Sequence, residues 1–252
     1  MPIIKTSGLV LKHTNLGEAD RILTLLTMDK GKIKAYSKGC RRSKSSLTSS
    51  SELFAFSDFV LFKGTNFYHV SHGELRESFY DLRKDLTRLS YGVYFAELAD
   101  AVTDEDMNSK KILLLLARTL YYLSNMEIPM GTLSCVYQLK LMDLSGFRPS
   151  LYKCVNCGKE SKFTKFSINL GGVLCDNCLC SDIKVEKVNP NTLEIFRVFI
   201  ATPISRLNTI KIDNTIFIEA DRLITSFVQL HLDKKFKSMN FINTIKNFDS
   251  IK

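Results

Sequence analysis

The chain has 252 residues, of which 45% are hydrophobic and 24% charged, an ordinary composition for a globular protein. Its 35 Lys and Arg residues outnumber 26 Asp and Glu residues, giving a formal net charge of +9. This charge favours a polyanionic partner, either nucleic acid or an anionic membrane surface, over a protein that is merely basic. No apolar run approaches the about 18 residues of a membrane span, and Met1–Lys12 lacks the pattern of a signal peptide. We therefore expect a cytoplasmic protein.

The N-terminal part of the chain carries the pattern of five short strands. Two of the turns between them, Asp29-Lys30-Gly31 and Gly64-Thr65-Asn66, contain a glycine that can adopt a positive φ. The pattern predicts a small β-barrel, for which the oligonucleotide/oligosaccharide-binding (OB) fold is the commonest five-stranded choice. Lys38–Ser51, with six serines in the nine residues Ser43–Ser51, is expected to be an exposed, mobile loop. The predicted strands are Ile3–His13, Arg21–Met28, Lys32–Ser37, Leu53–Phe62 and Phe67–Leu75.

After the strands, apolar residues recur with the period of amphipathic helices. The first stripe begins at Phe79 and continues to Ala96. Further helices are expected over Lys110–Asn125, Thr132–Leu144, from Asn189-Pro190 to before Pro203, and over Glu219–Phe236. We expect an α+β multidomain fold: an OB-fold barrel over residues 1–78, a helical domain over 79–150 and 185–252, and an inserted four-cysteine zinc ribbon over 151–184.

Four of the seven cysteines have the spacing of a zinc ribbon, Cys154-x2-Cys157 and Cys175-x2-Cys178, with 17 residues between the pairs. Four thiolates in a tetrahedron suit zinc and leave no coordination position open, so one structural Zn²⁺ is expected. Cys180 is a further candidate ligand. The alternative is two reduced CxxC pairs, one of them redox-active, although no βαβ pattern surrounds either pair.

A basic segment without any acid runs from Lys30 to Lys44. Lys32 and Lys34 alternate on a strand and share one face, on which Tyr36 is the next residue. Basic side chains neutralise phosphates and an aromatic ring can stack on a base, so we predict a single-strand groove here. If about six of these charges meet phosphates, log affinity should fall with log salt at a slope of roughly −4. The predicted DNA contacts are Lys30, Lys32, Lys34, Lys38, Arg41, Arg42 and Lys44.

Motifs of nucleotide-driven or nucleophilic catalysis are missing from the sequence. There is no Walker-type loop, no dinucleotide fingerprint, no nucleophile elbow and no acidic cluster typical of a two-metal nuclease. Nothing in the sequence argues for an enzyme. Two readings besides DNA binding stay open: a zinc-ribbon adaptor with an acidic protein partner, and a redox protein that uses its CxxC pairs.

Short stretches along nearly the whole chain resemble, in order, the RecO family of bacterial DNA-repair proteins. The metal pairs fall where that family carries its zinc site. The stretches are Gly17-Glu18-Ala19-Asp20-Arg21, Lys38-Gly39-Cys40-Arg41-Arg42-Ser43-Lys44-Ser45, Leu82-Arg83-Lys84-Asp85-Leu86, Gly146-Phe147-Arg148-Pro149, Gly171-Gly172-Val173-Leu174-Cys175 and Lys235-Phe236-Lys237-Ser238.

The resemblance implies a non-catalytic recombination mediator that works on the chromosome. Such a protein binds single- and double-stranded DNA and anneals complementary strands. Its implied partners are RecR, the acidic C-terminal tail of single-strand-binding protein and, indirectly, RecA. By position, the family's basic motif falls on Lys38, Arg41, Arg42 and Lys44, and its metal ligands fall on Cys154, Cys157, Cys175 and Cys178.

Overall fold

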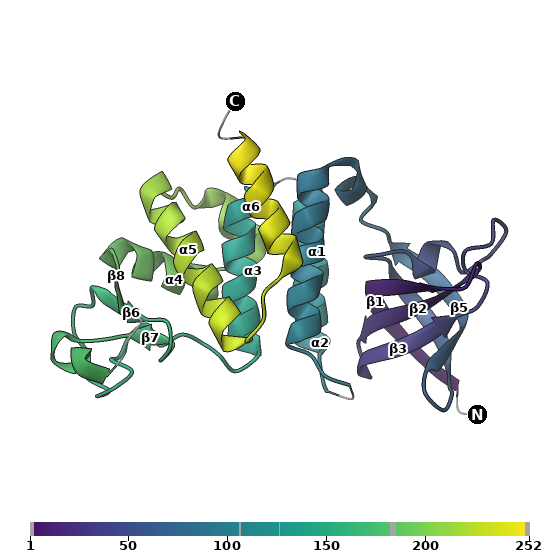
Figure 1. Cartoon of the computed structure of the whole chain (residues 1–252), viewed down its shortest axis with the longest axis horizontal. Coiled ribbons are helices and arrows are strands. Elements are labelled where there is room, and N and C mark those ends of the chain that lie inside the picture. The colour runs from purple at the N-terminus through teal and green to yellow at the C-terminus, as the bar shows by residue number, and fades with distance from the viewer. Residues whose placement is uncertain (1–2, 106, 126, 182–184, 250–252) are drawn as a thin grey trace. The chain divides into compact units, whose positions relative to one another are not determined.

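The computed structural model describes residues 3–105, 107–125, 127–181 and 185–249, which divide into two compact units (Figure 1). One unit comprises Met1–Asn125 together with Ser238–Lys252, and the other comprises Met126–Lys237. The first unit is thus built from two segments far apart in the sequence. Among the described residues, no helix has both the length and the apolar character needed to cross a membrane.

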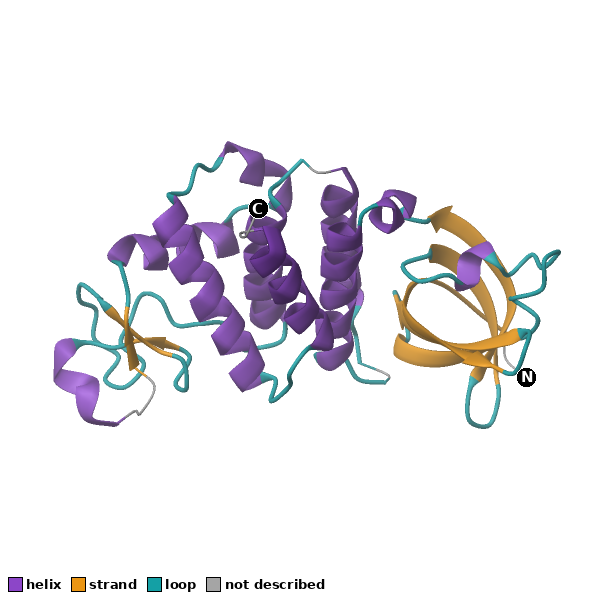
Figure 2. Cartoon of the chain, turned by 45° about the horizontal axis from the view of Figure 1, so that its top comes forward, coloured by secondary structure: helices purple, strands orange, loops and turns teal. Residues whose placement is uncertain are grey.

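A closed five-stranded barrel forms the N-terminal part of the first unit (Figure 2). Neighbouring strands follow the order β1-β2-β3-β5-β4, with β1 closing onto β4 and β3 running parallel to β5. The predicted barrel is confirmed, and a helical region follows it as expected. The strands are β1 (Ile3–Leu16), β2 (Asp20–Thr27), β3 (Gly31–Ser37), β4 (Phe56–Lys63) and β5 (Tyr68–Glu77).

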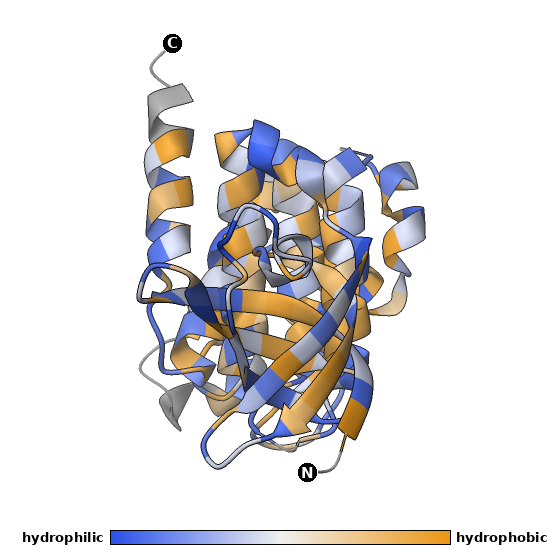
Figure 3. Ribbon diagram, turned by 90° about the vertical axis from the view of Figure 1, so that its right-hand side faces the viewer, coloured by the Kyte–Doolittle hydropathy of each residue, from blue (hydrophilic) through white to orange (hydrophobic). Residues whose placement is uncertain are grey.

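Alternate residues of the strands point into the barrel and form its core. Leu23 and Leu25 on β2 are fully buried, and Ile33 and Ala35 on β3 are at most 3% exposed. The residues between them face outward, and Figure 3 shows the resulting alternation of hydrophobic and hydrophilic positions along the strands. Burial of one such aliphatic side chain contributes about 1.5–3 kcal/mol, so the alternation itself stabilises the barrel.

The segment between β3 and β4 packs more closely than its serine-rich composition predicts. Ser50 and Ser51 are fully buried, and Leu47 belongs to the barrel core. The hydroxyls of Ser51 and Ser37 lie 2.9 Å apart, and the Ser50 hydroxyl donates to the Leu47 carbonyl oxygen. The prediction of an exposed loop is therefore wrong for Leu47, Ser50 and Ser51. Their polar groups are satisfied locally, which allows a serine-rich sequence to be buried.

Three helices accompany the barrel in the first unit: α1 (Leu86–Ala101), α2 (Lys110–Asn125) and α6 (Lys237–Asp249). The predicted stripe that begins at Phe79 covers two elements, because Asp85 is extended between a short 3-10 helix (Tyr80–Lys84) and α1. The Asp85 carboxylate caps α1 by accepting the Arg88 N–H at 2.8 Å. The predicted bounds of α2 are confirmed, whereas α6 has no counterpart among the predicted helices.

The described part of the second unit contains three α-helices, two 3-10 helices (Asp176–Ser181 and Ile204–Thr209) and a small three-stranded sheet. The predicted helix over Glu219–Phe236 lies earlier in the chain, because Asp213 caps its start by accepting the Thr215 N–H at 2.9 Å. Asp233, with a φ of 45°, follows its end. The helices are α3 (Met130–Leu144), α4 (Pro190–Ala201) and α5 (Asn214–His231), and the strands are β6 (Lys165–Ser167), β7 (Gly172–Val173) and β8 (Val185–Lys187).

Candidate nucleic-acid interface and metal centre

The outer wall formed by β1, β2 and β3 carries a row of basic residues. Lys12 pairs in register with Thr24, which pairs with Lys34, and Lys32 lies on the same face of β3. In OB folds, strands 2 and 3 and the adjoining loops bind oligonucleotides. Two of the predicted contacts, Lys32 and Lys34, therefore lie on the expected wall. Lys12 lies beside these two lysines because β1 pairs with β2, which pairs with β3. No local run of charge in the sequence indicates that Lys12 belongs to this surface.

The last turn of α1 and the segment that follows it bring three carboxylates to this same wall. The Lys32 ammonium lies 3.0 Å from Asp100 Oδ1 and 2.7 Å from the Asp100 carbonyl oxygen. The backbone of Glu105 forms isolated β-bridges to Gly31 and Lys32. We call Asp100, Asp104 and Glu105 the acidic strap. A hollow of about 320 Å³ is lined by the acidic strap together with Lys12, Thr24, Lys32 and Lys34.

The acidic strap changes the interpretation of the basic segment. The sequence from Lys30 to Lys44 has no acid, but the surface around Lys32 and Lys34 has three. Lys32 is only partly exposed and its ammonium is already hydrogen-bonded to Asp100. Lys30 and Lys34 are exposed. Of the three predicted contacts in the β2–β3 hairpin, Lys32 is thus the one already engaged within the protein.

The other four predicted contacts lie on the loop after β3, where Arg41 Nη1 donates to the Gly17 carbonyl oxygen at 3.1 Å. Lys38, Arg41, Arg42 and Lys44 are all exposed, whereas Cys40 between them is fully buried in the barrel core. We call residues 38–44 the basic loop. Because the buried Cys40 side chain holds the loop backbone against the barrel, the four basic side chains extend from one defined part of the barrel surface.

The turn between β1 and β2 anchors the basic loop. The Asp20 carboxylate accepts the Gly39 N–H at 2.6 Å, and the Ala19 carbonyl oxygen accepts the Arg41 N–H at 2.9 Å. The Tyr36 hydroxyl also donates a short hydrogen bond to Asp20. The donations from Tyr36 and Gly39, with the nearby Arg42, hold the pKa of the Asp20 carboxyl below its usual value. Asp20 therefore stays ionised at neutral pH, and its anchoring role was not apparent from its position at the start of a strand.

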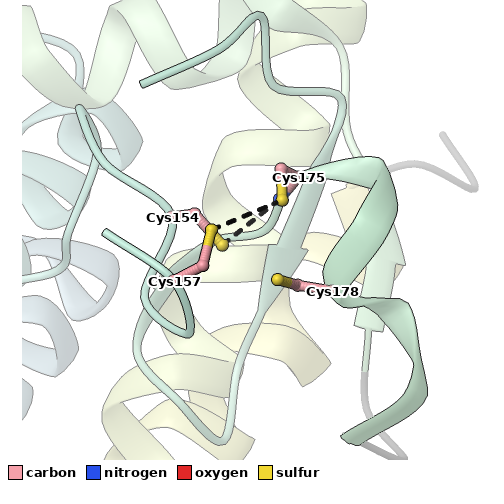
Figure 4. A group of neighbouring side chains, drawn as sticks. All are labelled: Cys154, Cys157, Cys175 and Cys178. Carbon is pink, nitrogen blue, oxygen red and sulfur yellow. Dashed lines mark hydrogen bonds between the residues drawn. The ribbon is translucent and has the colours of Figure 1, made fainter. Parts of the chain in front are cut away.

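The four predicted metal ligands converge in the second unit (Figure 4). Their sulfur atoms all lie within 4.8 Å of one another, and Cys157 Sγ is 3.7 Å from Cys175 Sγ. Tetrahedral coordination with bonds of about 2.3 Å places sulfurs about 3.8 Å apart, so the cluster has the dimensions of a metal site. The side chain of Cys180 lies outside the described residues.

Tight turns position the two cysteine pairs. Gly158, with a φ of 71°, donates its N–H to the Cys154 carbonyl oxygen at 2.9 Å and completes the first turn. The second turn is closed by the Cys178 N–H, which donates to the Cys175 carbonyl oxygen at 3.1 Å. The first turn is joined to the sheet by the Val155 N–H, which donates to the Val173 carbonyl oxygen at 3.0 Å, and the second turn follows β7 directly along the chain. The small sheet therefore holds both pairs in place.

Backbone groups at the cluster favour a thiolate. Burial opposes ionisation of Cys154, but the N–H groups of Cys175, Cys157 and Asn156 that point at its sulfur lower its pKa to about 6. Hydrogen bonding to Cys178 and burial raise the pKa of Cys175 to about 12. The backbone around Cys154 thus favours its ionised form, the form in which a cysteine binds a metal cation.

Comparison with known proteins covers almost the whole chain. Residues 1–79 match the family "Recombination protein O N terminal", and residues 83–240 match "Recombination protein O C terminal". The "DNA repair protein RecO" of Alkaliphilus metalliredigens is 36% identical over 96% of this chain and 100% of its own length. Proteins of the same name from Thermoanaerobacter sp. and Acetivibrio thermocellus are 34% and 33% identical, over 98% and 97% of this chain and 100% and 98% of their own lengths. The chain therefore belongs to the RecO family of DNA repair proteins.

Proposed function

We propose that the chain is a non-enzymatic recombination mediator that binds single- and double-stranded DNA and anneals complementary strands. The observation that carries the proposal is the basic loop, in which four exposed cations project from a backbone fixed by Cys40 and Asp20. Lys30 and Lys34 extend this surface along the barrel. Lys32 is left out because its ammonium is bound to Asp100.

Annealing needs a protein that screens the repulsion between two phosphate backbones without fixing the bases. Lysine and arginine side chains on a loop do this, because they release condensed counterions and contact phosphates rather than base edges. Two strands held in this way can search for their register. The reaction makes and breaks no covalent bond, so the proposal needs neither a nucleophile nor a nucleotide cofactor.

We further propose that Cys154, Cys157, Cys175 and Cys178 hold one Zn²⁺ in a structural role. Four sulfur donors of suitable spacing prefer zinc among the common metals, and they leave no position for a substrate or water. The bound metal would supply folding energy to a small sheet whose three strands contain only three, two and three residues. Cysteine pairs with this role are kept reduced, as expected in the cytoplasm at the nucleoid.

The partners follow from the family and belong to the proposal. With RecR, the chain would help RecA replace single-strand-binding protein on DNA, and it would contact the acidic C-terminal tail of that binding protein. A net charge of +9 fits both an acidic tail and DNA.

An annealing assay tests the proposal. Two complementary labelled oligonucleotides are mixed with the protein, and the rate of duplex formation is followed by energy transfer. The wild type should accelerate annealing, and replacement of Lys38, Arg41, Arg42 and Lys44 by alanine should remove most of that acceleration. The control is a variant with equal loss of charge at exposed residues of the second unit, Lys159, Lys162, Lys187 and Lys211.

The control variant should retain most of the wild-type rate. If the wild type does not accelerate annealing, the proposal is wrong. Equal losses of annealing rate in the two variants would mean that only the net charge of the protein matters. The basic loop would then not be the surface responsible for annealing.

A further inference from the structure

A row of ring and apolar side chains crosses the outer wall of the barrel from β3 to β1. Tyr36 on β3 pairs in register with His69 on β5, His69 pairs with Phe62 on β4, and Phe62 pairs with Ile3 on β1. The Tyr36 and His69 rings are 5.6 Å apart and nearly perpendicular, at 82°. His69 and Ile3 are exposed, and Tyr36 and Phe62 are half-buried. We call Tyr36, His69, Phe62 and Ile3 the aromatic row.

Neighbouring groups hold the rings of this row, in which His69 is exposed and Tyr36 and Phe62 are half-buried. The Tyr36 hydroxyl is bound to Asp20, which holds the end of the phenol at the edge of the basic loop. Gly64, in the turn between β4 and β5, lies against the His69 imidazole, and a Cβ at Gly64 would be 2.7 Å from His69 Nε2. An exposed ring that is already oriented loses little conformational entropy when a flat ligand stacks on it.

Positive charge lies on both sides of the aromatic row. Lys34 and Lys38 are exposed two residues before and two residues after Tyr36. Lys63 follows Phe62 and lines a hollow of about 170 Å³ together with Lys34 and with Glu105 of the acidic strap. On the wall of β1, β2 and β3, Lys34 also lines the hollow that contains Asp100 and Asp104. Cations interleaved with exposed rings are the combination that binds single strands irrespective of sequence.

We propose that single-stranded DNA crosses the barrel wall along the aromatic row, with bases stacked on Tyr36, His69 and Phe62 and phosphates near Lys34 and Lys38. This inference rests on the proposed DNA-binding function and adds to it a preference for unpaired bases. The faces of paired bases are hidden inside a duplex, so the aromatic row can contact a duplex only through its backbone.

The dimensions of the row agree with this path. Its four residues lie on four adjacent strands, and three spacings of about 4.8 Å give a length of roughly 14 Å. A stacked strand advances about 3.4 Å per nucleotide, so the row matches about four nucleotides. Site sizes for one OB fold begin at about four nucleotides.

The first test removes the bases and keeps the phosphates. Binding of the full chain to a fluorescent thymidine oligonucleotide is compared with binding to an abasic oligonucleotide of equal length and to a duplex. Loss of the bases should weaken binding at least tenfold. His69→Ala should weaken binding to the thymidine oligonucleotide about tenfold, with an unchanged salt slope and unchanged duplex affinity. The control is His72→Ala, an exposed histidine on the same strand that pairs with Val60 outside the row.

The second test uses the absence of tryptophan from the chain. His69→Trp places a single fluorophore in the aromatic row and preserves a stacking surface, whereas His72→Trp places one outside it. Single-stranded DNA should quench the fluorescence of His69→Trp and leave that of His72→Trp nearly unchanged.

The outcomes separate the two proposals. Equal affinity for the abasic and thymidine oligonucleotides, or His69→Ala binding like the wild type, would overturn stacking on the row while the DNA-binding function stands. Failure of the wild type to bind any of the three probes would overturn the proposed function itself, and the stacking proposal with it.

Discussion

The Lys32 ammonium lies 3.0 Å from the Asp100 carboxylate. This ion pair joins the second residue of β3 to the last turn of α1. The Asp100 carbonyl oxygen accepts a second hydrogen bond from the same ammonium at 2.7 Å. A lysine in the middle of a basic segment is thus committed to an acid 68 residues away in the chain. With Lys32 bound to Asp100, the barrel cations that remain available to DNA are those of the basic loop and those beside the aromatic row.

Neutralising the acidic strap should strengthen DNA binding. Asp104 and Glu105 are exposed and line the same hollow as Lys12 and Lys34, so they repel a phosphate backbone that approaches these lysines. Asp104→Asn with Glu105→Gln should raise the affinity for a short oligonucleotide about two- to fivefold at low salt, from about 1 kcal/mol of removed repulsion. Titration by fluorescence anisotropy measures this change.

The gain should shrink at high salt, where charges are screened within about a Debye length. The matched control is Glu127→Gln with Glu194→Gln, which neutralises two exposed acids of the second unit. If both double variants raise the affinity equally, the effect is one of net charge and the acidic strap has no special position.

Loss of the Asp20 carboxylate should loosen the basic loop. Asp20→Ala removes the acceptors of the Gly39 N–H and the Tyr36 hydroxyl, so the amides of the basic loop should exchange hydrogen faster. Hydrogen-exchange mass spectrometry of peptides that cover residues 38–44 gives the readout. Glu18→Ala, which removes an exposed acid from the same turn, should leave this exchange unchanged. Equal protection in Asp20→Ala and the wild type would contradict the anchoring role.

The anchor should also persist into acid. Hydrogen bonds from Tyr36 and Gly39 hold the pKa of Asp20 below its ordinary value of 3.8, so the folded state binds this proton less readily than the unfolded state. The contact is therefore fully present at neutral pH and is lost only as the pH falls below about 4. Tyr36→Phe removes the principal cause and should move the titration of Asp20 upward. Carboxyl chemical shifts recorded between pH 2 and 6 compare the titration of Asp20 in Tyr36→Phe with that in the wild type. Identical titrations would contradict the role of the Tyr36 hydrogen bond.

Removal of one metal ligand should release zinc and destabilise the second unit. Cys154→Ser should contain no stoichiometric zinc and should melt at a lower temperature, because structural zinc supplies on the order of 10 kcal/mol of binding energy to folding. Elemental analysis and a thermal melt measure the two effects. Cys135→Ser is a matched control, since Cys135 is a buried cysteine of α3 that is not part of the cluster. A Cys154→Ser protein with full zinc content and full stability would rule out this structural role.

Substitution of Gly31 should disturb the contact between the β2–β3 turn and the segment after α1. Gly31 has a φ of 64°, and a Cβ there would lie 2.2 Å from the Met107 carbonyl oxygen. Gly31→Ala combines an unfavourable backbone conformation with a collision against backbone, so it should reduce the free energy of unfolding by about 1–3 kcal/mol. Gly17→Ala also has a positive φ but no heavy atom within 4 Å, and it should cost less. Urea denaturation measures the free energy of unfolding of both variants. Equal losses would show that the structure relaxes to relieve the collision at Gly31.

The barrel and the cysteine cluster could be predicted because their signals are local. Alternation along β2 and β3, with a glycine turn at Gly31, specifies a hairpin from a few neighbouring residues. The spacing of Cys154 and Cys157, repeated at Cys175 and Cys178, predicts that the four cysteines cluster as metal ligands would, before any contact is known. The residues that determine the hairpin lie close together in the sequence. Those that determine the cysteine cluster repeat a recognisable CxxC spacing.

The features that sequence reasoning missed depend on contacts between distant segments. Nothing in the segment around Asp104 and Glu105 indicates that it folds over Lys32, and the row of Tyr36, His69 and Phe62 exists only once β5 is placed between β3 and β4. Ser50 and Ser51 are polar by composition, yet their environment buries them. Such positions follow from tertiary packing, which overrides local propensity.

The most direct test of the central claim is the salt dependence of single-strand binding by the wild type and by the variant with alanine at Lys38, Arg41, Arg42 and Lys44. Affinity for a fluorescent oligonucleotide is measured over a series of salt concentrations. We predict a wild-type slope of log affinity against log salt of roughly −4, and a slope nearer −1 to −2 for the variant, since each lost phosphate contact reduces it by about 0.7. Equal slopes and affinities for the two proteins would contradict a DNA surface on the basic loop.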